Sequence, residues 1–117
     1  MKMAKNRDNP EDVIAIKIFR TKSLNTFHSP NSIKRVRREI AMMRFAKHPH
    51  LVRFYWEHSD ERFIYVAQEI AHKGDLSKAF HNKRPLSLNI ATPIIREVVY
   101  GLEYIHSLGC CHRDLKL

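Results

Sequence analysis

Hydrophobic residues gather in short runs along the first half of this chain, and the spacing within each run predicts its secondary structure. Residues 13–19 are apolar and mostly β-branched, with one lysine among them, which is typical of a strand buried on both faces. Two further runs, 51–56 and 63–69, enclose the polar turn 59–62 and predict an antiparallel hairpin. Residues 1–12 are polar and end in turn-forming side chains, so the pattern predicts three strands.

A helical repeat follows the first predicted strand and a polar loop over residues 20–31. Ser32 can accept hydrogen bonds at the start of a helix that runs over about residues 33–46. Apolar side chains recur within it at intervals of three and four, as one buried helix face requires, and these are Ile33, Val36, Ile40 and Met43. The pattern therefore predicts an amphipathic helix packed against the strands.

The second half of the chain is predicted to be mainly helical. Residues 73–75 predict a turn before a short helix over 76–80, and a longer helix is expected after Pro85. Pro93 either begins or bends this longer helix, and Gly109 can end it. Its predicted apolar face consists of Ile90, Ile94, Val98, Leu102 and Ile105.

Two charged residues border the predicted core. Lys17 lies inside an apolar strand, where an unpaired buried ammonium is costly. Glu39 lies three residues after Val36 and four before Met43, so it borders the buried stripe of the predicted helix. Two arrangements are open: the two side chains pair with each other, or Lys17 extends its ammonium to water while Glu39 pairs with basic neighbours.

Composition and charge narrow the function classes. The net charge is +9, but the densest basic run, residues 34–38, falls on the solvated face of the predicted helix, and no zinc-finger or RNP pattern is present, so no nucleic-acid partner is expected. No apolar run approaches the ~18 residues of a membrane span. Cys110 and Cys111 are adjacent and predict two reduced thiols, which fits an intracellular protein, cytoplasmic or nuclear.

The last residues of the chain, 112–117, open with His-Arg-Asp-Leu and resemble the H-R-D-L catalytic loop of protein kinases. Four earlier segments resemble other motifs of that family, in the family's order: Ile14-Ala15-Ile16-Lys17, Arg38-Glu39-Ile40, His48-Pro49-His50-Leu51-Val52, and Ile64 to Glu69 with Gly74-Asp75-Leu76. The resemblance implies an α+β, partial protein-kinase-like fold. Residues 1–70 would form part of the small lobe, with an antiparallel sheet and the regulatory helix, and residues 71–117 the hinge and the first helices of the large lobe.

The resemblance also implies roles for single residues in phosphoryl transfer from ATP to a protein substrate. Lys17 would hold the α- and β-phosphates and would itself be held by Glu39. Asp114 would accept the proton of the substrate hydroxyl. Lys116 is similar to the lysine of serine/threonine-type loops, which neutralises charge on the transferred phosphoryl group.

The adenosine end of ATP would meet a second set of residues. Ala15 would cover the adenine ring, and Gln68 falls at the gatekeeper position at the back of the adenine pocket. The backbone of Glu69 and Ala71 would hydrogen-bond the adenine edge. Asp75 would reach the ribose.

Several parts of a kinase fall outside the printed residues. Gly74, Gly101 and Gly109 are the only glycines, so no glycine-rich loop is expected near the N-terminus. The asparagine and the D-F-G aspartate that hold Mg²⁺ would follow Leu117, so no metal ligand is expected in this chain, and the chain as printed is expected to be inactive. Two alternatives remain: a non-catalytic module that binds nucleotide or occupies a kinase partner as a decoy, or an incomplete gene model.

Overall fold

The computed structural model describes residues 1–21, 31–80 and 86–116, and the chain forms two compact units. The first unit consists of Met1–Lys47 and Val52–Ile70, and the second of His48–Leu51 and Ala71–Leu117. Most of the loop expected over 20–31 lies outside the described residues, as do Pro85 and Leu117.

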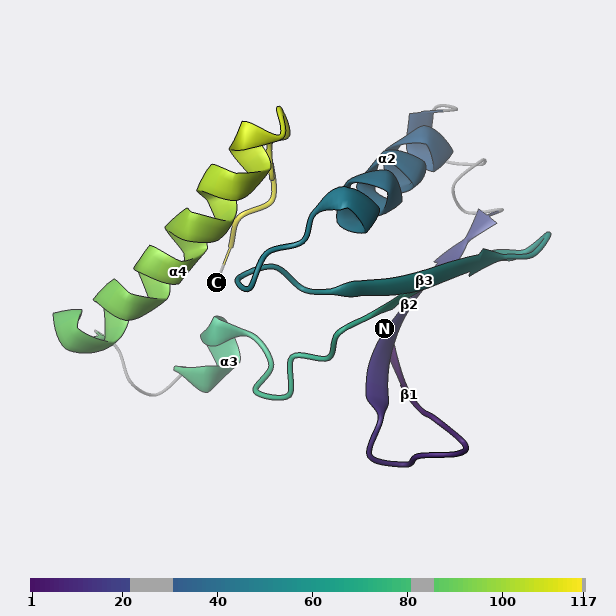
Figure 1. Ribbon diagram of the computed structural model, residues 1–117, viewed down its shortest axis with the longest axis horizontal. Coiled ribbons are helices and arrows are strands. Elements are labelled where there is room, and N and C mark those ends of the chain that lie inside the picture. The colour runs from purple at the N-terminus through teal and green to yellow at the C-terminus, as the bar shows by residue number, and fades with distance from the viewer. Residues whose placement is uncertain (22–30, 81–85, 117) are drawn as a thin grey trace. The chain divides into compact units, whose positions relative to one another are not determined.

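A four-stranded antiparallel sheet forms the base of the first unit, with the strand order β1-β2-β4-β3 (Figure 1). Its strands are β1 (Lys2–Lys5), β2 (Val13–Arg20), β3 (Phe54–Ser59) and β4 (Phe63–Gln68). The predicted hairpin of β3 and β4 is confirmed by their antiparallel pairing. β3 begins three residues later than expected, because the N–H of Leu51 donates to the carbonyl of His48 and closes a turn.

The expectation of only three strands was wrong, because residues before the turn form β1. This edge strand pairs through its backbone with β2, from Lys2 opposite Ile16 to Lys5 opposite Val13. The N–H of Asn6 donates to the carbonyl of Asp12 across 3.0 Å and closes the connection. The short Lys-Met-Ala-Lys segment lacks the β-branched residues that mark a strand, and lysines are common on the edges of sheets, so its pattern gave little signal.

Helix α2 (Asn31–Phe45) packs against one face of this sheet (Figure 1). Val36 and Ile40 of the helix form a buried cluster with Ile64 and Val66 of β4, and Phe19, Met43 and Phe54 pack around it. The helical spacing of the apolar residues therefore predicted the buried face correctly. The predicted start was wrong: α2 begins at Asn31, so Ser32 lies inside the helix and does not precede it.

The second unit contains the short helix α3 (Leu76–Ala79) and the long helix α4 (Leu88–Ser107). α4 begins five residues before Pro93, so the proline is not its first residue. Gly109 has a φ of +72° and donates its N–H to the carbonyl of His106, which confirms the predicted glycine cap.

The predicted apolar face of α4 is only partly buried. Ile105 is 1% exposed, whereas Ile90 at the other end of the face is 44% exposed. Among the described residues, none of the helices combines the length and apolarity needed to cross a membrane.

Candidate active site

The structure brings Lys17 and Glu39 together. Lys17 lies in the middle of β2, opposite Val66 of β4, and its ammonium donates to Glu39 Oε1 of α2 across 2.7 Å. Two sequence properties produce this contact: the strand places Lys17 on the face that α2 covers, and the helix places Glu39 beside its buried stripe. Of the two arrangements that the spacing allowed, the ion pair is the one present.

This lysine–glutamate pair (Lys17 with Glu39) is partly open to water. The Lys17 side chain is 37% exposed and the Glu39 side chain 48%. The Lys17 ammonium also lies 4.9 Å from the ring centroid of Phe19, a cation–π contact on the same strand face. An ammonium group has three N–H donors, and Glu39 Oε1 accepts a hydrogen bond from one of them. The geometry therefore allows the Lys17 ammonium to bind an anion while Glu39 holds that ammonium in place.

Ala15 and Gln68 are direct register partners on β2 and β4. Ala15 is 3% exposed and Gln68 is half-buried, and Gln68 also lies opposite Phe54 of β3. Ala15 lies on the same face of β2 as Lys17, because side chains two residues apart in a strand point to the same side. The register therefore groups Ala15, Gln68 and Lys17 on neighbouring strands of the first unit.

Glu69 is tied to Arg53 by two hydrogen bonds. Its N–H donates to the Arg53 carbonyl across 2.8 Å, and the Arg53 N–H donates to Glu69 Oε2 across 3.1 Å. The N–H and the carboxylate of Glu69 are thus engaged within the first unit. The backbone carbonyl is therefore the group with which Glu69 could accept a hydrogen bond from an adenine edge.

In the second unit, Ala71 and Asp75 both belong to the turn before α3. The Ala71 carbonyl accepts the N–H of Gly74, which has a φ of +72°, so the group that Ala71 can offer a ligand is its N–H. Asp75 is the N-cap of α3: its Oδ1 accepts the N–H of Lys78 across 2.8 Å, and its Oδ2 lies 3.8 Å from the Lys78 ammonium. A ribose hydroxyl would have to share this carboxylate with the helix cap.

The final motif is described up to Lys116. Asp114 Oδ2 accepts a hydrogen bond from the Lys116 ammonium across 2.9 Å, and both side chains are about three-quarters exposed, 75% and 73%. The N–H of Asp114 donates to His112 Nδ1 across 3.3 Å. Arg113, between them, has a φ of +63°, a left-handed conformation that costs a non-glycine residue roughly 1–2 kcal/mol.

A polar cluster that the sequence indicated only as a turn joins β3 to β4. Asp60 Oδ1 accepts the N–H groups of Arg62 and Phe63, each across 2.7 Å, and Oδ2 accepts the hydroxyl of Tyr65 across 3.1 Å. The two backbone hydrogen bonds hold the pKa of Asp60 below its usual value. Desolvation, with the Asp60 carboxylate as hydrogen-bond partner, raises the pKa of Tyr65. The cluster stabilises the hairpin turn.

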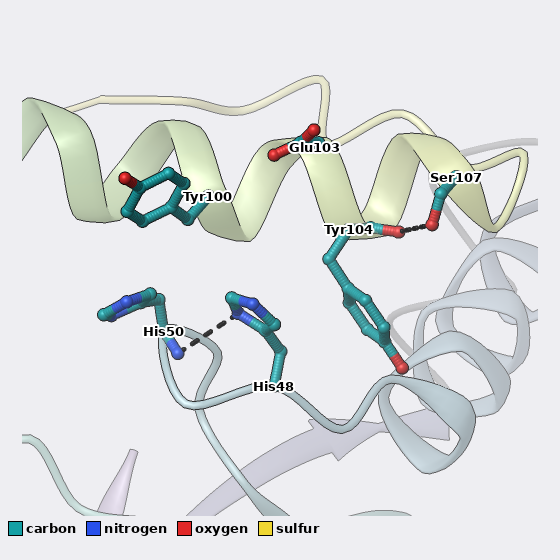
Figure 2. A pocket seen from close by; sticks show the side chains of 6 residues that line it. All are labelled: His48, His50, Tyr100, Glu103, Tyr104 and Ser107. Atoms are coloured by element: carbon teal, nitrogen blue, oxygen red, sulfur yellow. Dashed lines mark hydrogen bonds between the residues drawn. The ribbon is translucent and has the colours of Figure 1, made fainter.

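A pocket of about 400 Å³ lies within the second unit, and the residues expected to carry chemistry do not line it (Figure 2). His48 stacks on Tyr104 with ring centroids 5.0 Å apart, and His50 stacks on Tyr100 at 6.0 Å. His48 Nδ1 accepts the N–H of His50 across 3.3 Å. The lining residues are His48, His50, Tyr100, Glu103, Tyr104 and Ser107.

Comparison with known proteins gives consistent matches. The protein kinase domain family matches residues 2–117. The chain is similar to serine/threonine-protein kinase PLK4 of Xenopus tropicalis, with 31% identity over 105 residues, 89% of this chain and 11% of that protein. It is also similar to PLK4 of Drosophila melanogaster, with 37% identity over 84 residues, 71% of this chain and 11% of that protein.

A solved structure, Rad53 1-466 in complex with AMP-PNP, superposes with a TM-score of 0.80 and 26% identity over 97% of this chain and 28% of that chain. The chain thus spans about a tenth of the length of the curated relatives it matches. The fold is a partial protein-kinase-like fold of the α+β class. With the family matched over residues 2–117, this chain belongs to the protein kinase domain family.

Proposed function

We propose that these residues serve an ATP-dependent protein kinase that transfers the γ-phosphate of ATP to serine or threonine hydroxyls of protein substrates. The observation that carries the proposal is the 2.7 Å ion pair between Lys17 of β2 and Glu39 of α2. A strand lysine oriented by a helix glutamate is the device with which protein kinases hold ATP phosphates. The names of the PLK4 relatives and the lysine two residues after Asp114 support the serine/threonine preference.

The proposed chemistry assigns one task to each charged side chain. Lys17 binds phosphate oxygens, and Glu39 keeps its ammonium in place while they bind. Asp114 accepts the proton of the substrate hydroxyl as that oxygen bonds to the γ-phosphorus and the bond to the β-phosphate oxygen breaks. Lys116, whose ammonium lies 2.9 Å from Asp114 Oδ2, neutralises charge on the transferred group.

We assign the adenosine contacts to the residues that the resemblance implies. Ala15 offers a small apolar surface to adenine, Gln68 borders the same strand pair, and the Glu69 carbonyl and the Ala71 N–H act as acceptor and donor. Asp75 contacts the ribose through a carboxylate that it shares with its helix cap.

Mg²⁺ would neutralise the phosphate charge when bound with ATP. Over the described ranges 1–21, 31–80 and 86–116, no three His, Cys, Asp or Glu side chains gather where they could together hold a metal ion. We further propose that residues 1–70 are small-lobe residues and 71–117 large-lobe residues of an intracellular kinase.

The test is phosphoryl transfer from ATP to a mixture of protein substrates by the full-length gene product. Asp114→Asn should lower kcat about 10²- to 10⁴-fold, the usual contribution of a positioned base, and should leave the KM for ATP nearly unchanged. Lys17→Met should lower kcat/KM for ATP. Asp8→Asn makes the same charge change as Asp114→Asn at an exposed residue of the first unit and should retain full activity.

Analysis of the phosphorylated residues then tests the finer part of the proposal. Phosphate on serine and threonine agrees with it, and phosphate on tyrosine alone contradicts the serine/threonine preference. Full activity of the Asp114→Asn variant would contradict the kinase mechanism itself.

A further inference from the structure

A second ion pair links helix α2 to the sheet, and it takes no part in the proposed chemistry. Arg44 Nη2, one residue before the end of α2, lies 2.8 Å from Glu57 Oε1 of β3. The Arg44 guanidinium also lies 5.8 Å from the ring centroid of Phe54, which packs against the core of the first unit. The arginine–glutamate pair (Arg44 with Glu57) thus has an electrostatic and a packing contact with the same strand.

The register of the sheet relates the arginine–glutamate pair to the lysine–glutamate pair. Val66 of the inner strand β4 has Lys17 as its partner on β2 and Glu57 as its partner on β3. Direct register partners point to the same face of a sheet, so Lys17, Val66 and Glu57 form one row across the face that α2 covers. The row has a cation at one end, a buried valine in the middle and an anion at the other end.

The helix presents the complementary arrangement. Glu39 and Arg44 are five residues apart, which places them about 140° apart around the helix axis. Ile40, 4% exposed, lies between them on the buried stripe. Glu39 and Arg44 therefore lie on opposite sides of that stripe, and each meets the opposite charge at its own end of the sheet row. A rotation of α2 about its axis displaces both contacts together.

We propose that Arg44 and Glu57 are positioning residues that hold α2 in the rotation at which Glu39 reaches Lys17, and that they thereby regulate how well Lys17 is placed for ATP phosphates. The link to phosphates rests on the proposed function, whereas the coupling between the two ion pairs does not. The arginine–glutamate pair is partly exposed, with side chains 56% and 37% accessible, and such pairs change an equilibrium about 1.4- to fivefold. Loss of either partner should therefore weaken the lysine–glutamate pair by a factor in that range.

The deciding experiment measures the rate at which an amine-reactive acylating reagent modifies Lys17, resolved by mass spectrometry, in the folded full-length gene product without nucleotide. Glu39 lies against the Lys17 ammonium, so release of Glu39 should speed the reaction. Glu39→Gln gives the rate of the fully released lysine. Arg44→Gln and Glu57→Gln should each raise the Lys17 rate about 1.4- to fivefold towards that limit.

Matched controls separate this effect from a general loss of charge. Arg38→Gln removes one arginine from the exposed side of the same helix, and Glu61→Gln removes one glutamate from the turn after β3. Neither control should change the Lys17 rate. Arg44→Glu places two carboxylates together and should raise the rate more than Arg44→Gln, and combining it with Glu57→Arg restores an ion pair of reversed polarity and should return the rate towards wild type.

The outcomes separate the inference from the proposed function, because acylation needs no catalysis. A raised Lys17 rate that the charge-reversed pair rescues supports the coupling, even in a preparation without kinase activity. An unchanged Lys17 rate in folded Arg44→Gln and Glu57→Gln variants overturns it, even if the protein is an active kinase. In an active preparation the same variants should raise the KM for ATP more than they lower kcat, and the charge reversal should restore the KM.

Discussion

Replacing Glu39 by glutamine should affect activity far more than stability. The change keeps the size of the side chain and removes the charge that holds Lys17, whose ammonium lies 2.7 Å from Glu39 Oε1. Two unit charges at this separation attract by about 1.5 kcal/mol in water. Because the side chains are 37% and 48% exposed and must be ordered to meet, the net contribution to folding should fall to about 0.2–1 kcal/mol.

The expected effect on phosphoryl transfer is larger, because a displacement of about 1 Å at a catalytic group can cost a hundredfold in rate. A hundredfold loss corresponds to about 2.7 kcal/mol of transition-state stabilisation, several times the stability loss. The assay is kcat/KM for ATP together with urea unfolding on the same preparations, with Glu61→Gln as the charge-matched control. A fall of kcat/KM by fivefold or less, equal to the loss of folding free energy, would refute the claim that Glu39 positions Lys17.

Three further predictions concern the scaffold. Asp60 has a lowered pKa in the folded state, so its stabilisation of the turn is present above the ordinary carboxyl pKa and is lost as the pH falls through the lowered value. The Asp60→Asn variant lacks this stabilisation, so its acid unfolding, followed by circular dichroism, should begin at a higher pH than that of the wild type. Gly101→Ala should lower the melting temperature although alanine favours helices by about 1 kcal/mol, because the new Cβ would lie 3.2 Å from the His50 carbonyl oxygen. Asp75→Ala should cost about 0.5–2 kcal/mol of unfolding free energy in urea titrations, because it removes the cap of α3, whereas Asp75→Asn should cost less.

The sequence allowed the lysine–glutamate pair to be anticipated because both of its residues depart from a strong local pattern. Lys17 is a charge within a β-branched run, and Glu39 lies next to a stripe of apolar residues at helical spacing. Each pattern fixes the face on which its residue lies, and the amphipathic helix predicted next after the strand is the one that carries Glu39. The distance between the two side chains then follows from packing that face onto the sheet.

Other features could not be predicted in this way. Strand β1 depends on backbone pairing with β2, and its Lys-Met-Ala-Lys sequence carries almost no strand preference. The pairing of Arg44 with Glu57 requires the strand order β2-β4-β3, which brings Glu57 into one row with Lys17 although the two are 40 residues apart. The engagement of Asp75 in a helix cap is local, and the sequence showed the turn but not which group its carboxylate would bind.

The most direct test of the phosphate-binding role of Lys17 is a crystal structure of the full-length gene product with a non-hydrolysable ATP analogue. The measured quantity is the distance from Lys17 Nζ to the nearest phosphate oxygen. We predict a charge-assisted hydrogen bond of about 2.7–2.9 Å, with Glu39 still bound to the same ammonium. An analogue whose phosphates bind away from Lys17 while the ion pair with Glu39 stays intact would contradict this role.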